Sequence, residues 1–197
     1  MKHARSRWGR MLAVGATVLA AVAGAHGAPA TPEMLSNACA GCHGTNGVSA
    51  GFSMPSLAGQ NRVAMIEAMK SFKSGERPSS VMGRLAKGYS DAEIEAMADF
   101  FTKQKPVRSE AQKVDLALVT KGKALHERHC KRCHLEGGKE FDENAAVLAG
   151  QWLKYLEIQM ADYADGKRKM SEKKAEKMKP LSRDELQAIA NYYASVK

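Results

Sequence analysis

Apolar residues recur at intervals of three and four positions in several separate segments of the chain. In the segment 61–73 these positions are Val63, Met65, Ile66, Met69 and Phe72. A later segment begins with the capping-box pattern Ser90-Asp91-Ala92-Glu93, and its inner face carries Ile94, Met97, Ala98 and Phe101. This periodicity is typical of amphipathic helices, and no segment alternates as a strand does. The sequence therefore predicts an all-α fold.

The predicted helices follow the same order in both halves of the chain. In the first half, a short helix over residues 32–38 precedes Cys39, and Pro106 marks a linker near residues 104–112. In the second half, the predicted helices span residues 114–129, 152–163 and 182–196, and the last begins with a second capping box at Ser182. Each half is thus expected to contain a leading, a middle and a terminal helix.

An internal repeat with a fixed offset of 91 residues explains this order. Cys39 corresponds to Cys130, Gly75 to Gly166, and the motif Leu57-Ala-Gly-Gln60 recurs as Leu148-Ala-Gly-Gln151. We therefore expect three parts: a signal peptide at 1–28, a first domain at 29–106 and a second domain at 107–197. Domains of this size form only small apolar cores.

The first part of the chain has the pattern of a secretory signal peptide. Four basic residues precede an apolar run over residues 11–25, and small residues follow. The run is shorter than the roughly 20 residues of a membrane-spanning helix, so cleavage is favoured over anchoring. The mature chain is then expected in the periplasm, without a membrane span.

Removing the signal segment lowers the formal charge from +9 to +5, because it contains four basic residues and no acidic one. Much of the remaining excess lies in residues 167–179. This stretch either steers an acidic partner or is a solvated helix face. Nucleic-acid binding is not expected, because aromatic residues do not interleave with the charges.

The repeated unit contains the motif Cys-x-x-Cys-His, which is the attachment signature of c-type haem. The predicted attachment residues are Cys39, Cys42, Cys130 and Cys133, and the predicted axial ligands are His43 and His134. Zinc and thioredoxin-like sites are the alternatives, but the two clusters lie far apart in the sequence. The two motifs use all four cysteines of the chain, so none remains for a disulfide or a catalytic thiol. His126 and His129 are interpreted as surface or packing residues.

The opposite axial position determines what each iron can do, since a methionine sulfur there blocks substrates and raises the potential. Met82 lies before the last helix of the first domain, far enough from His43 to reach the other haem face. Met54 is too close to His43. Other methionines occupy core-like helix positions, namely Met65, Met69, Met97 and Met160.

The second domain departs from the repeat at this point. The residue 91 positions after Met82 is Lys173, and one added residue would make it Lys174. Met170 and Met178 flank this position. We predict Met170 as the ligand, with Met178 and a lysine as alternatives.

Over nearly all of the mature chain, the sequence resembles the dihaem cytochrome subunit of flavocytochrome c sulfide dehydrogenase. The most specific stretches are Phe72-Lys-Ser-Gly-Glu76, Met82-Gly-Arg-Leu-Ala-Lys-Gly-Tyr-Ser90 and Leu148-Ala-Gly-Gln-Trp152. The resemblance implies two class-I cytochrome c domains with His/Met ligation, with Met82 and Met170 as ligands. Lys169 stands where that family often has proline.

The resemblance also implies a division of labour. An FAD-containing subunit would oxidise sulfide, and its electrons would pass through two covalent haems to a small soluble cytochrome c. This chain lacks a Gly-x-Gly-x-x-Gly turn, so FAD is expected only on the partner. The chain is not expected to be catalytic by itself.

Two alternatives remain at this point. A free tandem cytochrome c(4) shares the architecture and would carry electrons to a terminal oxidase without a flavoprotein. A catalytic dihaem enzyme, such as a peroxidase or a thiosulfate dehydrogenase, would need an open or unusually ligated haem. The absence of a fifth cysteine and of a well-placed spare histidine disfavours the enzyme.

Overall fold

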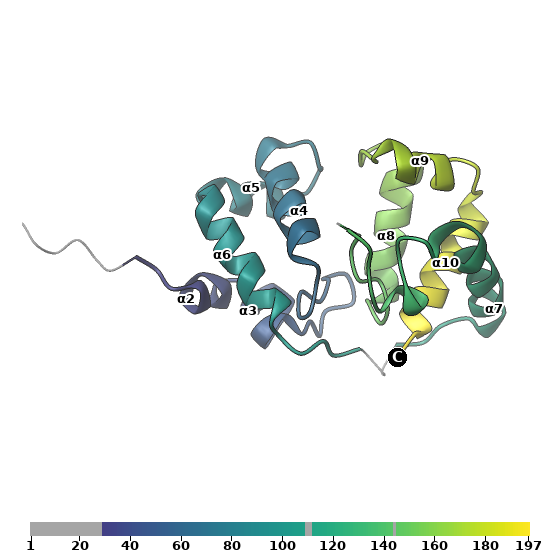
Figure 1. Cartoon of the computed structure of the whole chain (residues 1–197), viewed down its shortest axis with the longest axis horizontal. Coiled ribbons are helices and arrows are strands. Elements are labelled where there is room, and N and C mark those ends of the chain that lie inside the picture. Colours follow the sequence, from purple (N-terminus) through teal and green to yellow (C-terminus); the bar gives the residue numbers. More distant parts are fainter. Residues whose placement is uncertain (1–28, 109–111, 144) are drawn as a thin grey trace, which may run out of the picture. The chain divides into compact units, whose positions relative to one another are not determined.

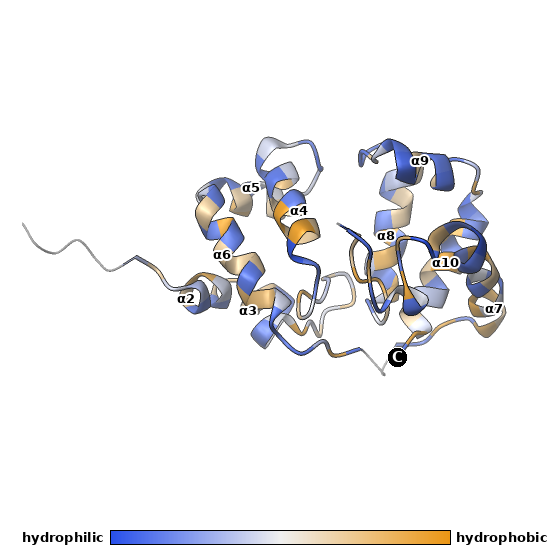
Figure 2. Cartoon of the chain, viewed as in Figure 1, coloured by the Kyte–Doolittle hydropathy of each residue, from blue (hydrophilic) through white to orange (hydrophobic). Residues whose placement is uncertain are grey.

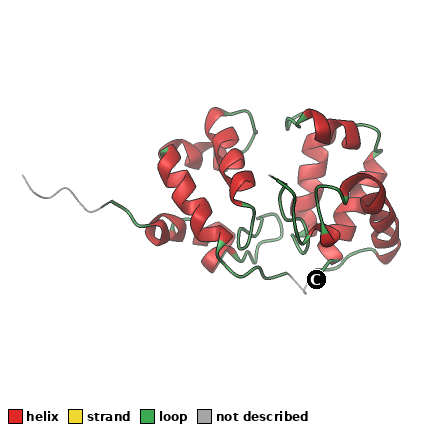
Figure 3. Ribbon diagram, in the orientation of Figure 1, coloured by secondary structure: helices red, strands yellow, loops and turns green. Residues whose placement is uncertain are grey.

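The computed structural model describes residues 29–108, 112–143 and 145–197, and all regular structure in these ranges is helical (Figure 3). The predicted signal peptide, residues 1–28, lies outside the described residues. Residues Thr31–Lys197 form one compact unit that holds every described helix. None of the helices described is long and apolar enough to cross a membrane.

The helices fall into two successive groups (Figure 1). The first group comprises α2 (Pro32–Asn37), α3 (Ala40–His43), α4 (Arg62–Ser74), α5 (Met82–Leu85) and α6 (Asp91–Thr102). The second comprises α7 (Leu116–Leu125), α8 (Leu153–Ala164), α9 (Glu172–Met178) and α10 (Arg183–Ser195), with a π-helical turn at His126–Cys130. Short 3₁₀ turns lie at Thr45–Gly47, Ala86–Gly88 and Glu136–Gly138.

Local hydrogen bonds explain where the long helices begin. The Ser90 hydroxyl accepts the Glu93 N–H at the start of α6, and the Glu93 carboxylate accepts the Ser90 N–H. Ser182 and Glu185 form the same capping box at the start of α10. Both predicted boxes are thereby confirmed.

Each group of helices packs around its own apolar cluster. Figure 2 shows apolar residues on helices of both groups. In the first group the buried members are Leu35, Ile94, Met97 and Phe101. In the second group they are Leu125, Leu156, Ala188, Ile189, Ala190, Tyr192, Tyr193 and Ala194. The predicted inner face of α6 is confirmed, because its buried residues are those expected. The predicted packing roles of Met65, Met69, Met97 and Met160 are also confirmed.

The crossing of α7 and α10 depends on a residue without a side chain. A Cβ atom built on Gly122 would overlap the carbonyl oxygen of Ala188. The two backbones approach as closely as they do only because residue 122 is glycine. Packing at this crossing holds the start of the second motif against the last helix.

Two parts of the helix prediction differ from the structure. The sequence predicts one helix over residues 114–129, but α7 ends at Leu125 and the chain continues as the π-helical turn. It predicts loops around Met82 and Met178, but these segments contain α5 and α9. Short helices of this kind lack the apolar periodicity from which longer helices are predicted.

The repeated Leu-Ala-Gly-Gln motif connects the two groups of helices. The Gln60 amide donates to the Val147 carbonyl (2.9 Å) and accepts from the Val147 N–H (3.1 Å). Gln151 does the same with Ser56, at 2.8 Å and 2.9 Å. Ser56 and Val147 occupy equivalent positions of the repeat, as do the two glutamines. The motif therefore forms a symmetric pair of two-point hydrogen bonds.

Candidate haem-binding sites

Each Cys-x-x-Cys-His motif forms a single helical turn. Cys39 precedes α3, and the backbone N–H groups of Cys42 and His43 both bond to its carbonyl. In the second motif, Cys133 and His134 bond to the carbonyl of Cys130 in the same way. Residues three apart on a helix lie on one side, so both thiols of a motif face the same direction. All four thiols are free, with Cys42 and Cys133 exposed.

The motif histidines are each held by a backbone carbonyl twelve residues later. The Nδ1 atom of His43 lies 2.8 Å from the Pro55 oxygen, and that of His134 lies 3.0 Å from the Ala146 oxygen. A carbonyl can only accept, so Nδ1 carries the proton and the lone pair is on Nε2. This orientation and tautomer are those of a histidine prepared to ligate a metal.

Electrostatics favour the neutral form of both imidazoles. Burial lowers the pKa of His43, and the bond to Pro55 partly offsets the effect. For His134, burial and then the charge of Lys174 lower the pKa to about 4. Both rings are therefore uncharged near pH 7, and no proton has to leave before Nε2 binds a metal. Burial also raises the pKa of the Cys39 and Cys130 thiols.

The predicted sixth ligand of the first site is the first residue of α5. Met82 is half-buried, and its backbone N–H donates to the Ser79 hydroxyl at 2.9 Å. Met54, which the sequence places too close to His43, is 37% exposed. Met82 remains our prediction for the first site, since it begins the short helix α5, a position that the packed methionines do not share.

Three candidate iron ligands of the second site lie in α9 or directly before it. Met170 is half-buried and directly precedes Ser171, the N-cap of α9, while Met178 is the last residue of that helix. Lys174 lies between them, and its Nζ is 3.7 Å from the centroid of the Tyr163 ring. The stretch 167–179 is therefore not uniformly a solvated face.

Sequence reasoning missed the aromatic support of the second site. The Tyr193 hydroxyl bonds to Nδ1 of His126 at 2.9 Å, and its ring centroid lies 6.1 Å from that of His134. His126 is 2% exposed, which confirms its packing role. The pattern Tyr192-Tyr193 at the end of a capped helix was the available signal, although it does not specify the partner.

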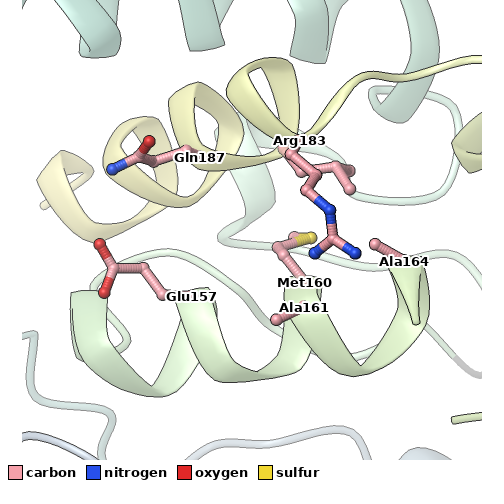
Figure 4. A pocket seen from close by; sticks show the side chains of 7 residues that line it. Glu157, Met160, Ala161, Ala164, Arg183 and Gln187 are labelled. Carbon is pink, nitrogen blue, oxygen red and sulfur yellow. The ribbon is translucent and has the colours of Figure 1, made fainter. Parts of the chain in front are cut away.

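The donor set fits a covalently attached haem c at each motif. Each motif has two free thiols three residues apart on one helical turn, and one neutral imidazole whose Nδ1 is bonded to a carbonyl, which leaves Nε2 for a metal. In the part of the chain that the structure describes, no group of three or more Cys, His, Asp and Glu residues is arranged to hold a metal ion. The groove between α8 and α10 in Figure 4, lined by residues such as Met160 and Arg183, contains no motif residue.

Comparison with known proteins places this architecture in a family. The family profile described as "Cytochrome C oxidase, cbb3-type, subunit III" matches residues 28–101 and again residues 117–192. The thiosulfate dehydrogenase electron acceptor of Thiomonas intermedia (strain K12) is 35% identical over 173 residues, which cover 81% of this chain and 77% of that protein. The chain belongs to the dihaem cytochrome c4-like family.

Two further proteins are similar to this chain, one over most of its length and one over about a third of it. The structure of Acidithiobacillus ferrooxidans cytochrome c4 matches with a TM-score of 0.72 and 26% identity, covering 81% of this chain and 99% of that chain. The cytochrome subunit of sulfide dehydrogenase from Chlorobaculum tepidum is 48% identical over 69 residues, which are 35% of this chain and 62% of that protein. The predicted fold of two tandem cytochrome c domains is confirmed.

The same comparisons limit the predicted resemblance to a sulfide dehydrogenase subunit to part of the chain. The sequence predicts likeness to a sulfide dehydrogenase subunit over nearly all of the mature chain, but it is found over about a third. Likeness over most of the chain is to the thiosulfate dehydrogenase electron acceptor and to cytochrome c4. This chain is therefore an electron-transfer cytochrome of the dihaem type.

Proposed function

We propose that this cytochrome carries two covalent haems, attached through Cys39 and Cys42 and through Cys130 and Cys133. His43 and His134 would each ligate one iron through Nε2, and Met82 would be the second protein ligand of the first iron. The haem supplies a one-electron iron couple whose potential depends on these ligands. The observation that carries the proposal is the repeated bond from each imidazole Nδ1 to a backbone carbonyl.

The electron donor in this proposal is the FAD-containing subunit of a sulfide dehydrogenase. It delivers single electrons to this cytochrome in the periplasm, and the electrons leave to a small soluble cytochrome c. The local 48% identity to a sulfide dehydrogenase cytochrome subunit supports this donor. All four cysteines belong to haem motifs, so the chain itself offers no thiol for sulfide chemistry.

A second candidate donor is a thiosulfate dehydrogenase. The relative that carries the name of its electron acceptor matches 81% of this chain, whereas the sulfide dehydrogenase subunit matches 35%. Both donors would use the two haem sites in the same manner. A free cytochrome c(4), which delivers electrons to a terminal oxidase without either dehydrogenase, remains the alternative.

The contacts between the two halves support passage of electrons within one chain. Gln60 and Gln151 each make two hydrogen bonds across the halves, and the Trp152 indole donates to the Ser49 carbonyl at 3.0 Å. These partners lie in the loops that also supply Pro55 and Ala146 to the motif histidines. The two halves are thus tied together by paired polar groups, of which Gln60, Gln151 and Trp152 are buried, and these bonds oppose separation of the two sites.

The donor is identified by reduction kinetics with purified proteins. The oxidised cytochrome is mixed with sulfide and the flavoprotein, or with thiosulfate and a thiosulfate dehydrogenase, while haem absorbance is recorded. Our proposal predicts rapid reduction of both haems with sulfide and the flavoprotein, and slow reduction when either is omitted. Rapid reduction only in the thiosulfate mixture would assign the second donor. Equal reduction rates with and without both dehydrogenases would contradict a dedicated donor and favour the free carrier.

A further inference from the structure

The second half contains a structural counterpart of Met82, although no methionine occupies it. Ser171 follows Ser79 by 92 residues, and Ser182 follows Ser90 by the same number. Ser79 accepts the backbone N–H of Met82, and Ser171 accepts the backbone N–H of Lys174, in both cases three residues later. Lys174 therefore stands in the structural position of Met82.

The second half contains one residue more than the first between equivalent positions, and this additional residue lies before α9. Equivalent residues of the two halves are still 91 positions apart at Arg168. The Arg168 guanidinium lies over the Tyr163 ring, 4.5 Å from its centroid, as that of Arg77 lies over the Phe72 ring, 4.4 Å from its centroid. From Ser171 onward, equivalent residues are 92 positions apart. The insertion thus lies at residues 169–170, so Met170 corresponds to the insertion or to Pro78, before the ligand position.

Met178 does not correspond to Met82 either. Its counterpart at an offset of 92 is Ala86, which is fully buried at 0% exposure. That residue lies one helical turn beyond Met82. Neither methionine near α9 therefore matches the position from which Met82 is predicted to bind iron.

Lys174 lies on α9, which packs against the turn His126–Cys130 at the start of the second motif. Its Nζ lies 3.7 Å from the Tyr163 ring centroid, and its charge acts on both Cys130 and His134. None of the ion pairs among the described residues includes Lys174, whereas its neighbour Lys173 reaches Glu143. The charges of Arg168 and Arg77 disfavour the ammonium form of this amine, a charged Cys130 favours it, and no carboxylate among the described residues forms an ion pair with it.

We propose that Lys174 is the sixth ligand of the second haem iron, opposite His134. This proposal rests on the proposed haem attachment at Cys130 and Cys133. On ligation the ammonium releases one proton to solvent, the nitrogen lone pair forms the bond to iron, and no electron is transferred. The inference and the sequence-based prediction of Met170 exclude each other.

A nitrogen ligand changes what the second haem does. Methionine sulfur raises the potential of a haem iron, so a His/Lys site has a lower potential than the His/Met site in the same chain. An electron that enters at the second haem then moves favourably to the first. The repeated architecture becomes a directed path from the half with Lys174 to the half with Met82.

The test uses the holo-cytochrome and counts methionine ligands by proton NMR of the reduced protein. A methionine bound to ferrous haem places its methyl resonance far upfield, because the methyl lies over the porphyrin ring. We expect one such resonance in the natural protein and in Met170→Ala, and two in Lys174→Met. Lys173→Ala is the matched control, and we expect it to leave the spectrum unchanged. In the ferric protein, Lys174→Ala should convert one of two low-spin haems to high-spin.

Two upfield methyl resonances in the natural protein, with one lost in Met170→Ala or in Met178→Ala, would overturn the inference. An unchanged ferric spectrum of Lys174→Ala would overturn it as well. If the Lys174 variants fail to fold, the spectra of the natural protein and of Met170→Ala still decide. Covalent haem per chain is measured on the same samples: fewer than two haems contradicts the proposed function, whereas two haems with two methionine ligands contradicts only the role of Lys174.

Discussion

Each motif histidine has one ring nitrogen available for iron, because the other is bound to a backbone carbonyl. The motif predicts the histidine, but the sequence does not show that Pro55 and Ala146 fix its tautomer. The second ligand of each iron is harder to predict, because it also depends on which distant segments come together. It comes from a distant segment, and one inserted residue before Ser171 changes which side chain stands at the position equivalent to Met82.

Replacing Met82 with alanine should remove the sixth ligand of the first haem without removing the haem. The thioether bonds are made by Cys39 and Cys42, so covalent haem should remain at two per chain. The reduced variant should bind carbon monoxide at one haem and show a lower potential there, because methionine raises it. Absorbance titration with carbon monoxide measures this change.

Met54→Ala is the control for that experiment, since Met54 is also a methionine of the first half but is exposed. It should bind carbon monoxide no better than the natural protein. Binding at one haem in Met54→Ala, but not in Met82→Ala, would contradict the assignment of Met82.

At the scale of elements, helices with a clear cap and apolar face were predictable. The capping boxes at Ser90 and Ser182 and the buried face of α6 appear as expected. The π-helical turn His126–Cys130 was not predictable, because the sequence pattern of residues 114–129 does not distinguish it from an α-helix. His126 in this turn bonds to Tyr193, 67 residues away. Helix α9 was not predictable either, since its sequence is mostly charged and has no apolar stripe.

The α7–α10 crossing gives a stability prediction. Gly122→Ala would place a methyl group in overlap with the Ala188 carbonyl oxygen, so the two helices must separate. We expect the free energy of unfolding of the holo-cytochrome to fall by about 1–3 kcal/mol. Gly88→Ala is the control, because nothing lies within 4 Å of the added atom. Denaturant titrations in which both variants unfold at the same midpoint would contradict the close crossing.

The repeated glutamines give a second prediction at this scale. Gln60→Ala leaves the buried N–H and carbonyl of Val147 without their partner. Leaving buried backbone groups unpaired costs about 1–3 kcal/mol. Gln187→Ala removes an exposed glutamine and should change the unfolding free energy by less than the error of the measurement. Equal stability of Gln60→Ala and the natural protein would show that these bonds do not hold the halves together.

At the scale of the whole molecule, the repeat accounts for both the likeness and the difference of the two halves. The cysteines, the histidines and their carbonyl partners follow it with an offset of 91 residues. The segment around α9 departs from it by one residue, and Lys174 stands there where the first half has Met82. Under the proposed ligation, two similar scaffolds would hold two haem sites that differ in ligand chemistry.

The proposed function requires that this chain hold two covalent haems that each take up one electron. Both numbers are obtained by coulometric reduction of purified holo-cytochrome whose mass has been determined after denaturation. We expect a mass increase of two haems per chain and an uptake of two electrons, in separate one-electron transitions. A mass increase of one haem, or an uptake of one electron by a chain with two haems, would contradict it.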